Sequence, residues 1–162
     1  MADLEQIGAP TAEPPHSIES ASVDEKGRLK LPAKMVEYLA ATGGTQVFIS
    51  TRDLRTVTIY PLSRWKHNEN VFEDAGEDAA AAERVALLMK YYGGDAEVDK
   101  SGRVLLPALL REELGLEKQS VVVHVHRGLL IVMSKKMHEE QVQAARATLL
   151  QDVGALQKKG FK

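Results

Sequence analysis

Cysteine is absent from this chain of 162 residues, and aromatic residues make up only 5% of it. The absence of cysteine excludes disulfides, thiolate zinc sites and a cysteine nucleophile. No apolar run reaches the ~18 residues of a membrane-spanning helix, because the best candidate, 121–133, is interrupted by His124, His126 and Arg127. The first residues lack the basic flank and apolar core of a secretory signal. We therefore expect a cytoplasmic protein that does not enter a membrane.

Charge is distributed unevenly, although the net charge is only −2. Residues 1–22 sum to −4 and residues 69–83 to −6, whereas residues 23–34 sum to +2. A chain with this balance does not coat nucleic acid indiscriminately, but it can present a local basic face.

An internal repeat organises the chain. The segment 23–33, VDEKGRLKLPA, returns 75 residues later as 98–108, VDKSGRVLLPA, with seven of eleven positions identical. Each copy continues into a helical pattern, 34–41 or 109–114, and then into two β-rich runs. The runs are 46–51 and 55–60 in the first copy, and 120–126 and 129–133 in the second. A unit this small has little core of its own, so we predict that the two copies interlock.

Turn residues identify a hairpin at the start of each copy. Asp24 and Asp99 open four-residue turns that Gly27 and Gly102 close, and glycine supplies the positive φ such turns require. After each turn the chain alternates, so Arg28 and Lys30 point away from Leu29 and Leu31.

Segments outside the repeat have other patterns. Residues 65–78 are acidic and interrupted by Gly76, and a helix is predicted from Asp78 or Ala79 to Tyr92. An apolar stripe predicts a second helix over 135–157. The expected organisation is a disordered acidic arm (1–17), a first repeat (18–65), an acidic connector and helix (66–92), a second repeat (93–134), and a C-terminal amphipathic helix and tail (135–162).

The doubled Asp-x-x-Gly-Arg-(x)3-Pro element, the run YPLSRW at 60–65 and the helix that begins near Glu83 together resemble the MraZ family. This is the two-repeat group among the AbrB/MazE-like transcription factors. The resemblance implies an α+β fold, a two-repeat swapped-hairpin (AbrB-like, double-split) β-barrel with flanking helices. It also implies a ring-like homo-oligomer that binds double-stranded DNA at short G-rich direct repeats upstream of the division and cell-wall gene cluster, as a repressor associated with the nucleoid.

By position, the resemblance places DNA contacts in the first copy. The candidate DNA-binding residues are Lys26, Arg28, Lys30, Lys34 and Arg103, while Asp24, Gly27, Asp99 and Gly102 are turn residues. Lys26, Lys30 and Lys34 align with Ser101, Leu105 and Leu109, so we expect the first copy to face DNA and the second to support the barrel and assembly.

Each candidate has a structural alternative. An Asp and an Arg four residues apart can pair across the turn and leave nothing for DNA, and the lysines can form a solvated surface. His124 and His126 share one face of a strand, but without a third ligand we expect no metal site. Trp65 is expected to pack at a helix start. We expect no cofactor and no enzyme, since the sequence contains no phosphate loop, GxSxG elbow or HExxH motif. The alternative function is an AbrB/MazE-like protein-interaction module of the antitoxin type.

Overall fold

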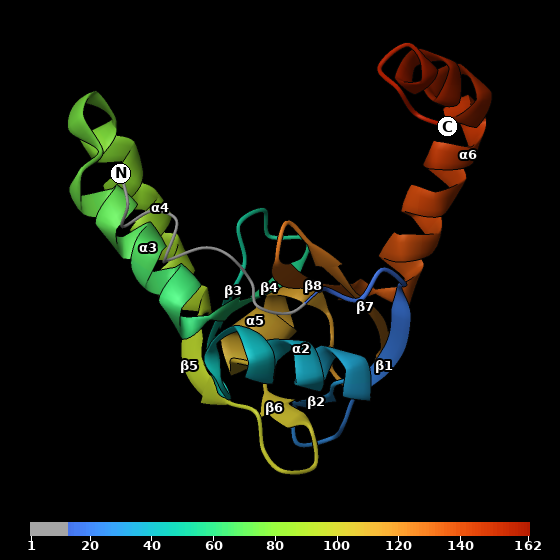
Figure 1. The fold of residues 1–162 in the computed structure, drawn as a ribbon. Helices are drawn as coiled ribbons and strands as arrows, with labels where there is room; N and C mark the ends of the chain where they lie inside the picture. The colour runs from blue at the N-terminus through green and yellow to red at the C-terminus, as the bar shows by residue number, and fades with distance from the viewer. Residues whose placement is uncertain (1–12) are drawn as a thin grey trace.

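The computed structural model describes residues 13–162, which form eight β-strands, five α-helices and one short 3₁₀ helix (Figure 1). The strands are β1 (Glu19–Val23), β2 (Arg28–Lys30), β3 (Gln46–Ser50), β4 (Val57–Pro61), β5 (Gly94–Glu97), β6 (Arg103–Leu105), β7 (Ser120–His126) and β8 (Leu129–Ser134). The helices are α2 (Ala33–Gly43), α3 (Leu62–Glu73), η1 (Gly76–Asp78), α4 (Ala79–Tyr92), α5 (Ala108–Leu114) and α6 (Lys135–Gln157).

The strands form one antiparallel sheet that closes almost completely into a barrel. Its order is β5-β3-β4-β8-β7-β1-β2-β6, and the two edge strands, β5 and β6, follow each other in the chain. The turn that connects these edge strands carries a hydrogen bond from the Asp99 N–H to the Arg103 carbonyl oxygen, 2.9 Å long. The protein is thus an α+β fold around a nearly closed barrel.

The two repeats exchange strands within this barrel. β1 from the first copy pairs with β7 from the second, and β5 from the second copy pairs with β3 from the first. β2 pairs with β6 and β4 pairs with β8, so further ladders also join one copy to the other. The predicted interlocking of the two copies is confirmed, and neither copy has a complete sheet without its counterpart.

The core lies inside the barrel and under α2 and α5. Because strand side chains alternate, each strand sends one set inward: Leu29 of β2 faces Val104 of β6, and both are fully buried. Met35 and Leu39 of α2 and Leu110 of α5 cover the barrel from outside the sheet. Burying each such side chain contributes about 1.5–3 kcal/mol, so the shared core explains why two small units form one stable body.

Two helical arms project from the barrel on the side opposite the turns 24–27 and 99–102 (Figure 1). The α3–α4 hairpin forms one arm and α6 forms the other. The sequence predicts α4 and α6 with the bounds that the structure shows, but it assigned no helix to the region of α3.

The helix α3 depends on an aromatic anchor rather than on an apolar stripe. Trp65 is 4% exposed and stacks on Phe48 of β3 with ring centroids 3.9 Å apart, and Phe72 meets it edge-on. The expectation that Trp65 packs at a helix start is confirmed. A single buried tryptophan gives no periodic pattern, which is why the acidic sequence concealed the helix.

The predicted disordered arm, 1–17, lies mostly outside the described residues, and the disorder stays a prediction. Within it, residues 13–16 line a hollow along α2 together with Lys34, Glu37 and Tyr38.

Candidate nucleic-acid interface

The two Asp-x-x-Gly-Arg turns share one backbone hydrogen-bond pattern. In the first turn the Asp24 carboxylate oxygen Oδ1 accepts from the N–H groups of Lys26 and Arg28, each at 2.9 Å. In the second, Asp99 Oδ1 accepts from the N–H groups of Ser101 and Arg103 at 2.8 and 2.9 Å. Both aspartates therefore hold their turns, as the sequence predicts for this residue at the first position.

These hydrogen bonds also keep the aspartates ionised. The pKa of Asp24 lies below its usual value, chiefly because it accepts the Arg28 backbone N–H. The pKa of Asp99 is lowered in the same way by the Arg103 backbone N–H, and the charges of Arg103 and Arg28 act in the same direction.

Glycine is required where each turn closes, and different side chains lie behind the two glycines. Gly27 has φ +81° and Gly102 has φ +78°. A Cβ on Gly27 would clash with the Arg111 guanidinium, whereas one on Gly102 would lie 3.2 Å from a methyl group of Val36. Arg111 in the second copy aligns with Val36 in the first, 75 residues earlier. Each glycine therefore faces a side chain from the other copy: Gly27 faces Arg111, and Gly102 faces Val36.

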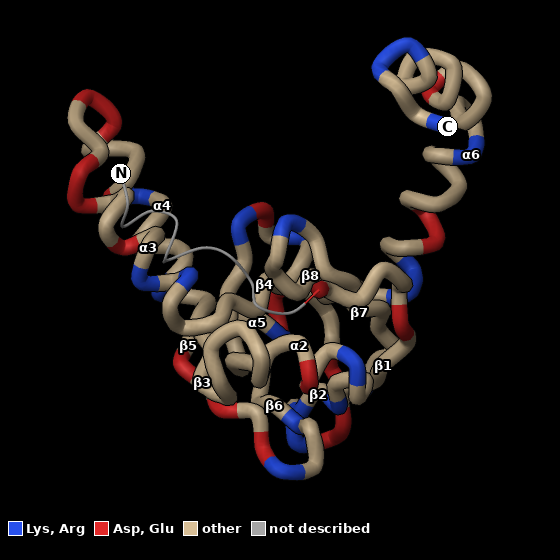
Figure 2. The backbone as a smooth tube through the Cα atoms, in the orientation of Figure 1, with Lys and Arg blue, Asp and Glu red and all other residues tan. Residues whose placement is uncertain are grey.

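Pairing of β2 with β6 brings cations from both copies onto one exposed face. The register sets Lys30 opposite Arg103 and Arg28 opposite Leu105, while Leu29 and Val104 point into the core. The two turns continue this face, and in Figure 2 both carry Lys and Arg at the end of the barrel away from the helical arms. We call this surface the basic face; its cations are Lys26, Arg28, Lys30, Lys100 and Arg103.

Some of the predicted DNA-binding residues form ion pairs with acidic side chains, and others do not. Arg28 Nε donates to Asp24 Oδ2 at 2.9 Å, and the Lys34 ammonium lies 3.4 Å from Glu19 Oε1. The side chains of Lys26, Lys30, Lys100 and Arg103 have no ion pair with any residue in 13–162. The Asp–Arg ion pair across the turn is thus present in the first copy and missing from the second.

Similarity to known proteins identifies the family. A Marinomonas sp. protein named "Transcriptional regulator MraZ" is 31% identical over 137 residues, covering 84% of this chain and 91% of its own. A match of this length includes most of both repeats. This chain belongs to the MraZ family.

Further comparisons agree. The MraZ of Acidobacterium capsulatum is 39% identical over 100 residues, 62% of this chain and 68% of its own. The MraZ of Symbiobacterium thermophilum is 32% identical over 124 residues, 76% of this chain and 86% of its own. A family model described as "MraZ protein, putative antitoxin-like" matches residues 94–155, from β5 into α6. These relatives are named as transcriptional regulators rather than enzymes, in agreement with the absence of catalytic motifs from the sequence.

The described residues of this MraZ-family chain form neither a metal site nor a membrane-spanning helix. The rings of His124 and His126 lie 6.4 Å apart, and no group of three or more His, Cys, Asp or Glu side chains within 13–162 is arranged to hold a metal ion. No helix in the same range has the length and apolarity needed to cross a bilayer.

Sequence reasoning missed one residue of the basic face, Lys100, and one residue that lies behind it, Arg111. Lys100 aligns with Glu25, so comparing the copies position by position would have revealed a cation on the second turn. Arg111 Nε donates to the Leu106 carbonyl oxygen at 3.0 Å, and its Nη1 donates to both Glu117 carboxylate oxygens, so it supports the first turn from α5. No local pattern distinguishes Arg111 from an ordinary helix-surface arginine.

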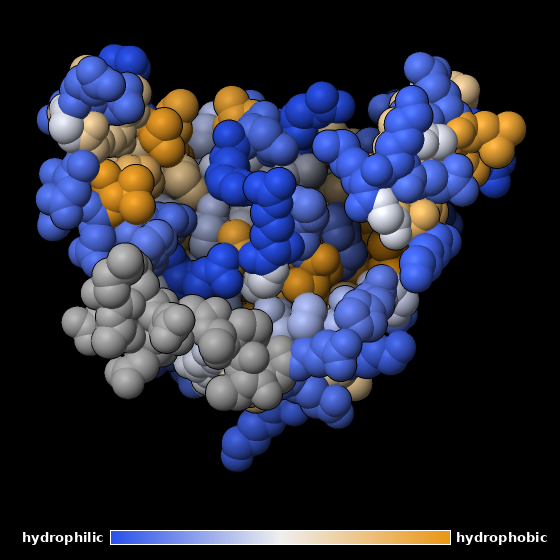
Figure 3. All heavy atoms as spheres, turned by 45° about the horizontal axis from the view of Figure 1, so that its top comes forward, coloured by the Kyte–Doolittle hydropathy of each residue, from blue (hydrophilic) through white to orange (hydrophobic). Residues whose placement is uncertain are grey.

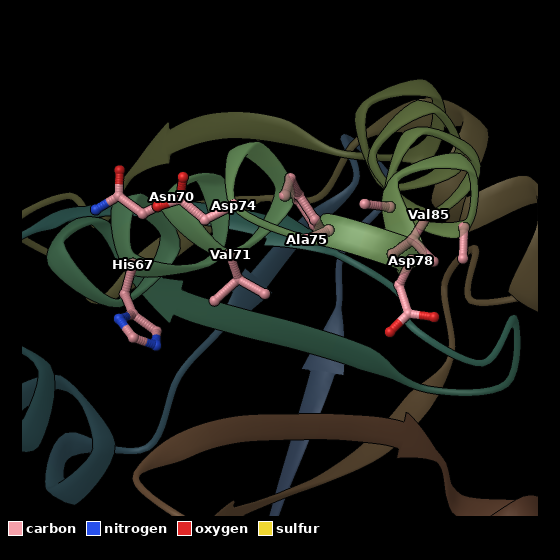
Figure 4. Close-up of a pocket in the computed structure, with 10 residues that line it drawn as sticks. His67, Asn70, Val71, Asp74, Ala75, Asp78 and Val85 are labelled. Atoms are coloured by element: carbon pink, nitrogen blue, oxygen red, sulfur yellow. The ribbon is translucent and has the colours of Figure 1, made fainter.

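A hollow of about 520 Å³ lies between α3 and α4 (Figure 4). Val71, Ala75 and Val85 line it, and the carboxylates of Asp74 and Asp78 stand at its rim. These acidic groups make it unsuited to DNA, and it lies on the helical arm far from the basic face.

Proposed function

We propose that this MraZ-family chain is a sequence-specific DNA-binding transcriptional regulator that contacts DNA through the basic face. The observation that carries the proposal is the β2–β6 register, which sets Lys30 opposite Arg103, and neither side chain forms an ion pair with any residue in 13–162. Cations without carboxylate partners are available to neutralise phosphates.

The geometry suits a duplex. A two-stranded ribbon of β2 and β6 has dimensions that the major groove admits, and three of its four outward side chains, Arg28, Lys30 and Arg103, are long cations that can reach base edges. Arginine or lysine against guanine O6 and N7 is the commonest specific contact, while Lys26 and Lys100 on the turns lie where they can meet flanking phosphates. Both copies then contribute, and Arg103 joins the site instead of serving only the barrel.

The finer function follows from the family resemblance. We infer a repressor of short G-rich direct repeats upstream of the division and cell-wall genes, built on the swapped-hairpin, AbrB-like barrel and acting in the cytoplasm at the nucleoid. In a ring-like assembly on tandem repeats, each DNA contact after the first is intramolecular, so many weak contacts together give a higher affinity. Exposed apolar side chains on α6 support assembly; they include Val142, Leu149, Leu150 and Leu156.

The test is fluorescence anisotropy with a duplex of G-rich direct repeats and a scrambled duplex of the same composition. The wild-type protein should prefer the repeats, and its affinity should fall steeply with salt. In Lys30→Ala/Arg103→Ala the log–log salt slope should become shallower by about two, because two phosphate or base contacts are lost.

The matched control is Lys158→Ala/Lys159→Ala, which removes two exposed cations beyond the end of α6. It should bind as wild type does. Equal binding by Lys30→Ala/Arg103→Ala, with unchanged fold and oligomer size, would show that the basic face is not the DNA site. If the wild-type protein binds neither duplex, the alternative of an antitoxin-type interaction module is favoured.

A further inference from the structure

A second concentration of positive charge lies away from the basic face. A hollow of about 410 Å³ opens where the β3–β4 connection and the β7–β8 turn meet α3, on the side of the barrel that carries the helical arms. Figure 3 shows strongly hydrophilic side chains gathered between these arms. We call it the arginine hollow; its lining includes Arg52, Arg64, Arg127, His67, His126 and Tyr60.

Within residues 13–162, no acidic side chain balances the charge of the arginine hollow. No Asp or Glu of this range lines it, and Arg52, Arg64 and Arg127 form no ion pair there. Guanidinium groups that gather without a carboxylate repel one another unless an anion joins them.

Backbone geometry holds two of these arginines in place. Arg127 and Gly128 form the two-residue turn between β7 and β8, and Arg127 has φ +51°, a conformation that costs about 1–2 kcal/mol for a residue with a Cβ. Arg64 Nη2 donates to the Arg127 carbonyl oxygen at 3.2 Å. The turn thus carries an arginine where glycine or asparagine would be less strained, and strain of this kind gathers at binding sites.

A buried hydroxyl group in the same hollow is unsatisfied. Tyr60 is 2% exposed, and its hydroxyl makes no hydrogen bond of good geometry with any described residue, although Thr58 is near. Burial raises the pKa of Tyr60, and the charges of Arg52 and Arg64, which line the same hollow, act in the opposite direction. A neutral phenol can donate to an anion held by those arginines.

Apart from Asn68, the remaining lining is apolar. Phe72, Met89 and Leu129 form one side, and the hollow shares His67, Phe72 and Val85 with the larger apolar hollow between α3 and α4 shown in Figure 4. A cationic end that can hold an anionic group and an adjoining apolar space within a few hundred Å³ are the features of a small-molecule site.

We propose that the arginine hollow binds a small organic phosphate: the guanidinium groups and the Tyr60 hydroxyl hold the phosphate, and the apolar side holds the organic part. Arginine suits this ligand because its planar fork matches phosphate oxygens in pairs. The site is separate from the basic face, so the proposal stands independently of DNA binding.

The experiment titrates the full chain with phenyl phosphate by isothermal calorimetry, with inorganic phosphate and phenol as partial probes. Phenyl phosphate should bind once per chain, more tightly than either partial probe, and should raise the melting temperature. In Arg52→Gln/Arg127→Gly the affinity should fall by at least about tenfold, since two charged contacts are lost. Glycine at 127 relieves the positive φ, so this variant should fold normally.

Two further variants separate binding from structure. Lys118→Gly is the matched control, because Lys118 also has a positive φ, +53°, but does not line the hollow. It should bind phenyl phosphate as wild type does. Tyr60→Phe should weaken binding severalfold without lowering the melting temperature of the free protein, because the hydroxyl has no hydrogen bond of good geometry to lose within residues 13–162.

Two results would overturn the proposal. The first is the absence of saturable binding of phenyl phosphate by the wild-type protein at millimolar concentrations. If Arg52→Gln/Arg127→Gly then also loses self-association, the arginines belong to a contact between two copies of this chain. The second is equal affinity in Arg52→Gln/Arg127→Gly.

Discussion

The turns 24–28 and 99–103 have the same hydrogen bonds but different surroundings. Both close on a glycine with positive φ, and both aspartates accept two backbone N–H groups. Only Arg28 pairs with its aspartate, and only Gly27 has an arginine behind it. The residues that the copies share specify the hairpin, and the residues that differ specify what each hairpin contacts.

The largest expected effect comes from the side chains behind the two glycines. Gly27→Ala should destabilise the protein by about 2–4 kcal/mol, because the methyl group meets positive-φ strain and displaces Arg111 from its hydrogen bonds. Gly102→Ala should cost only about 1–2 kcal/mol, since Val36 can shift slightly. Urea denaturation measures both. Equal losses would show that Arg111 does not distinguish the turns.

A smaller expected effect is the loss of stability at acidic pH. The folded-state pKa values of Asp24 and Asp99 are lowered, so each carboxylate stabilises the fold above its unfolded pKa, and this stability is lost as pH falls below about 4. Asp24→Ala and Asp99→Ala should each lower the melting temperature at neutral pH by about 2–4 °C and flatten its decline in acid. Thermal melts from pH 7 to pH 3 test this. If the melting temperature of both variants falls in acid as steeply as that of the wild type, the two aspartates do not stabilise the fold in this way.

Charge can be added to make the second copy resemble the first. Leu105 is 55% exposed and occupies the position of Lys30, so Leu105→Lys should place a further cation on the basic face. We expect DNA affinity to rise severalfold and the salt slope to steepen by about one. The matched control is Leu150→Lys on α6, where the side chain is 88% exposed and far from the basic face. An equal gain in both variants would indicate a general effect of net charge.

The smallest expected effect is a difference between Arg28 and Arg103 in their contribution to stability. The Arg28–Asp24 pair is half-exposed, with side chains 39% and 34% accessible, so solvent screens it. Arg28→Ala should therefore lower the melting temperature by no more than about 1–2 °C, and Arg103→Ala by less, because its side chain has no ion pair within 13–162. A larger loss for Arg103→Ala would restore the sequence-based expectation that the second copy serves structure first.

The sequence by itself determined the local structure. Asp, Gly and Pro at fixed positions specify the hairpins and the helix starts, because turn chemistry acts over a few residues. Alternation placed Leu29 inward and Lys30 outward, and the apolar stripe defined α6 from end to end. The repeat also predicted that the copies interlock.

Only the tertiary structure decided which distant residues meet. The β2–β6 register set Lys30 beside Arg103, although 73 positions separate them in the chain. Trp65 stabilised α3 by stacking on Phe48, and the barrel gathered Arg52, Arg64 and Arg127 around one hollow. Such contacts depend on how strands and helices from separate segments pack, and no pattern along the sequence encodes the distance between their residues.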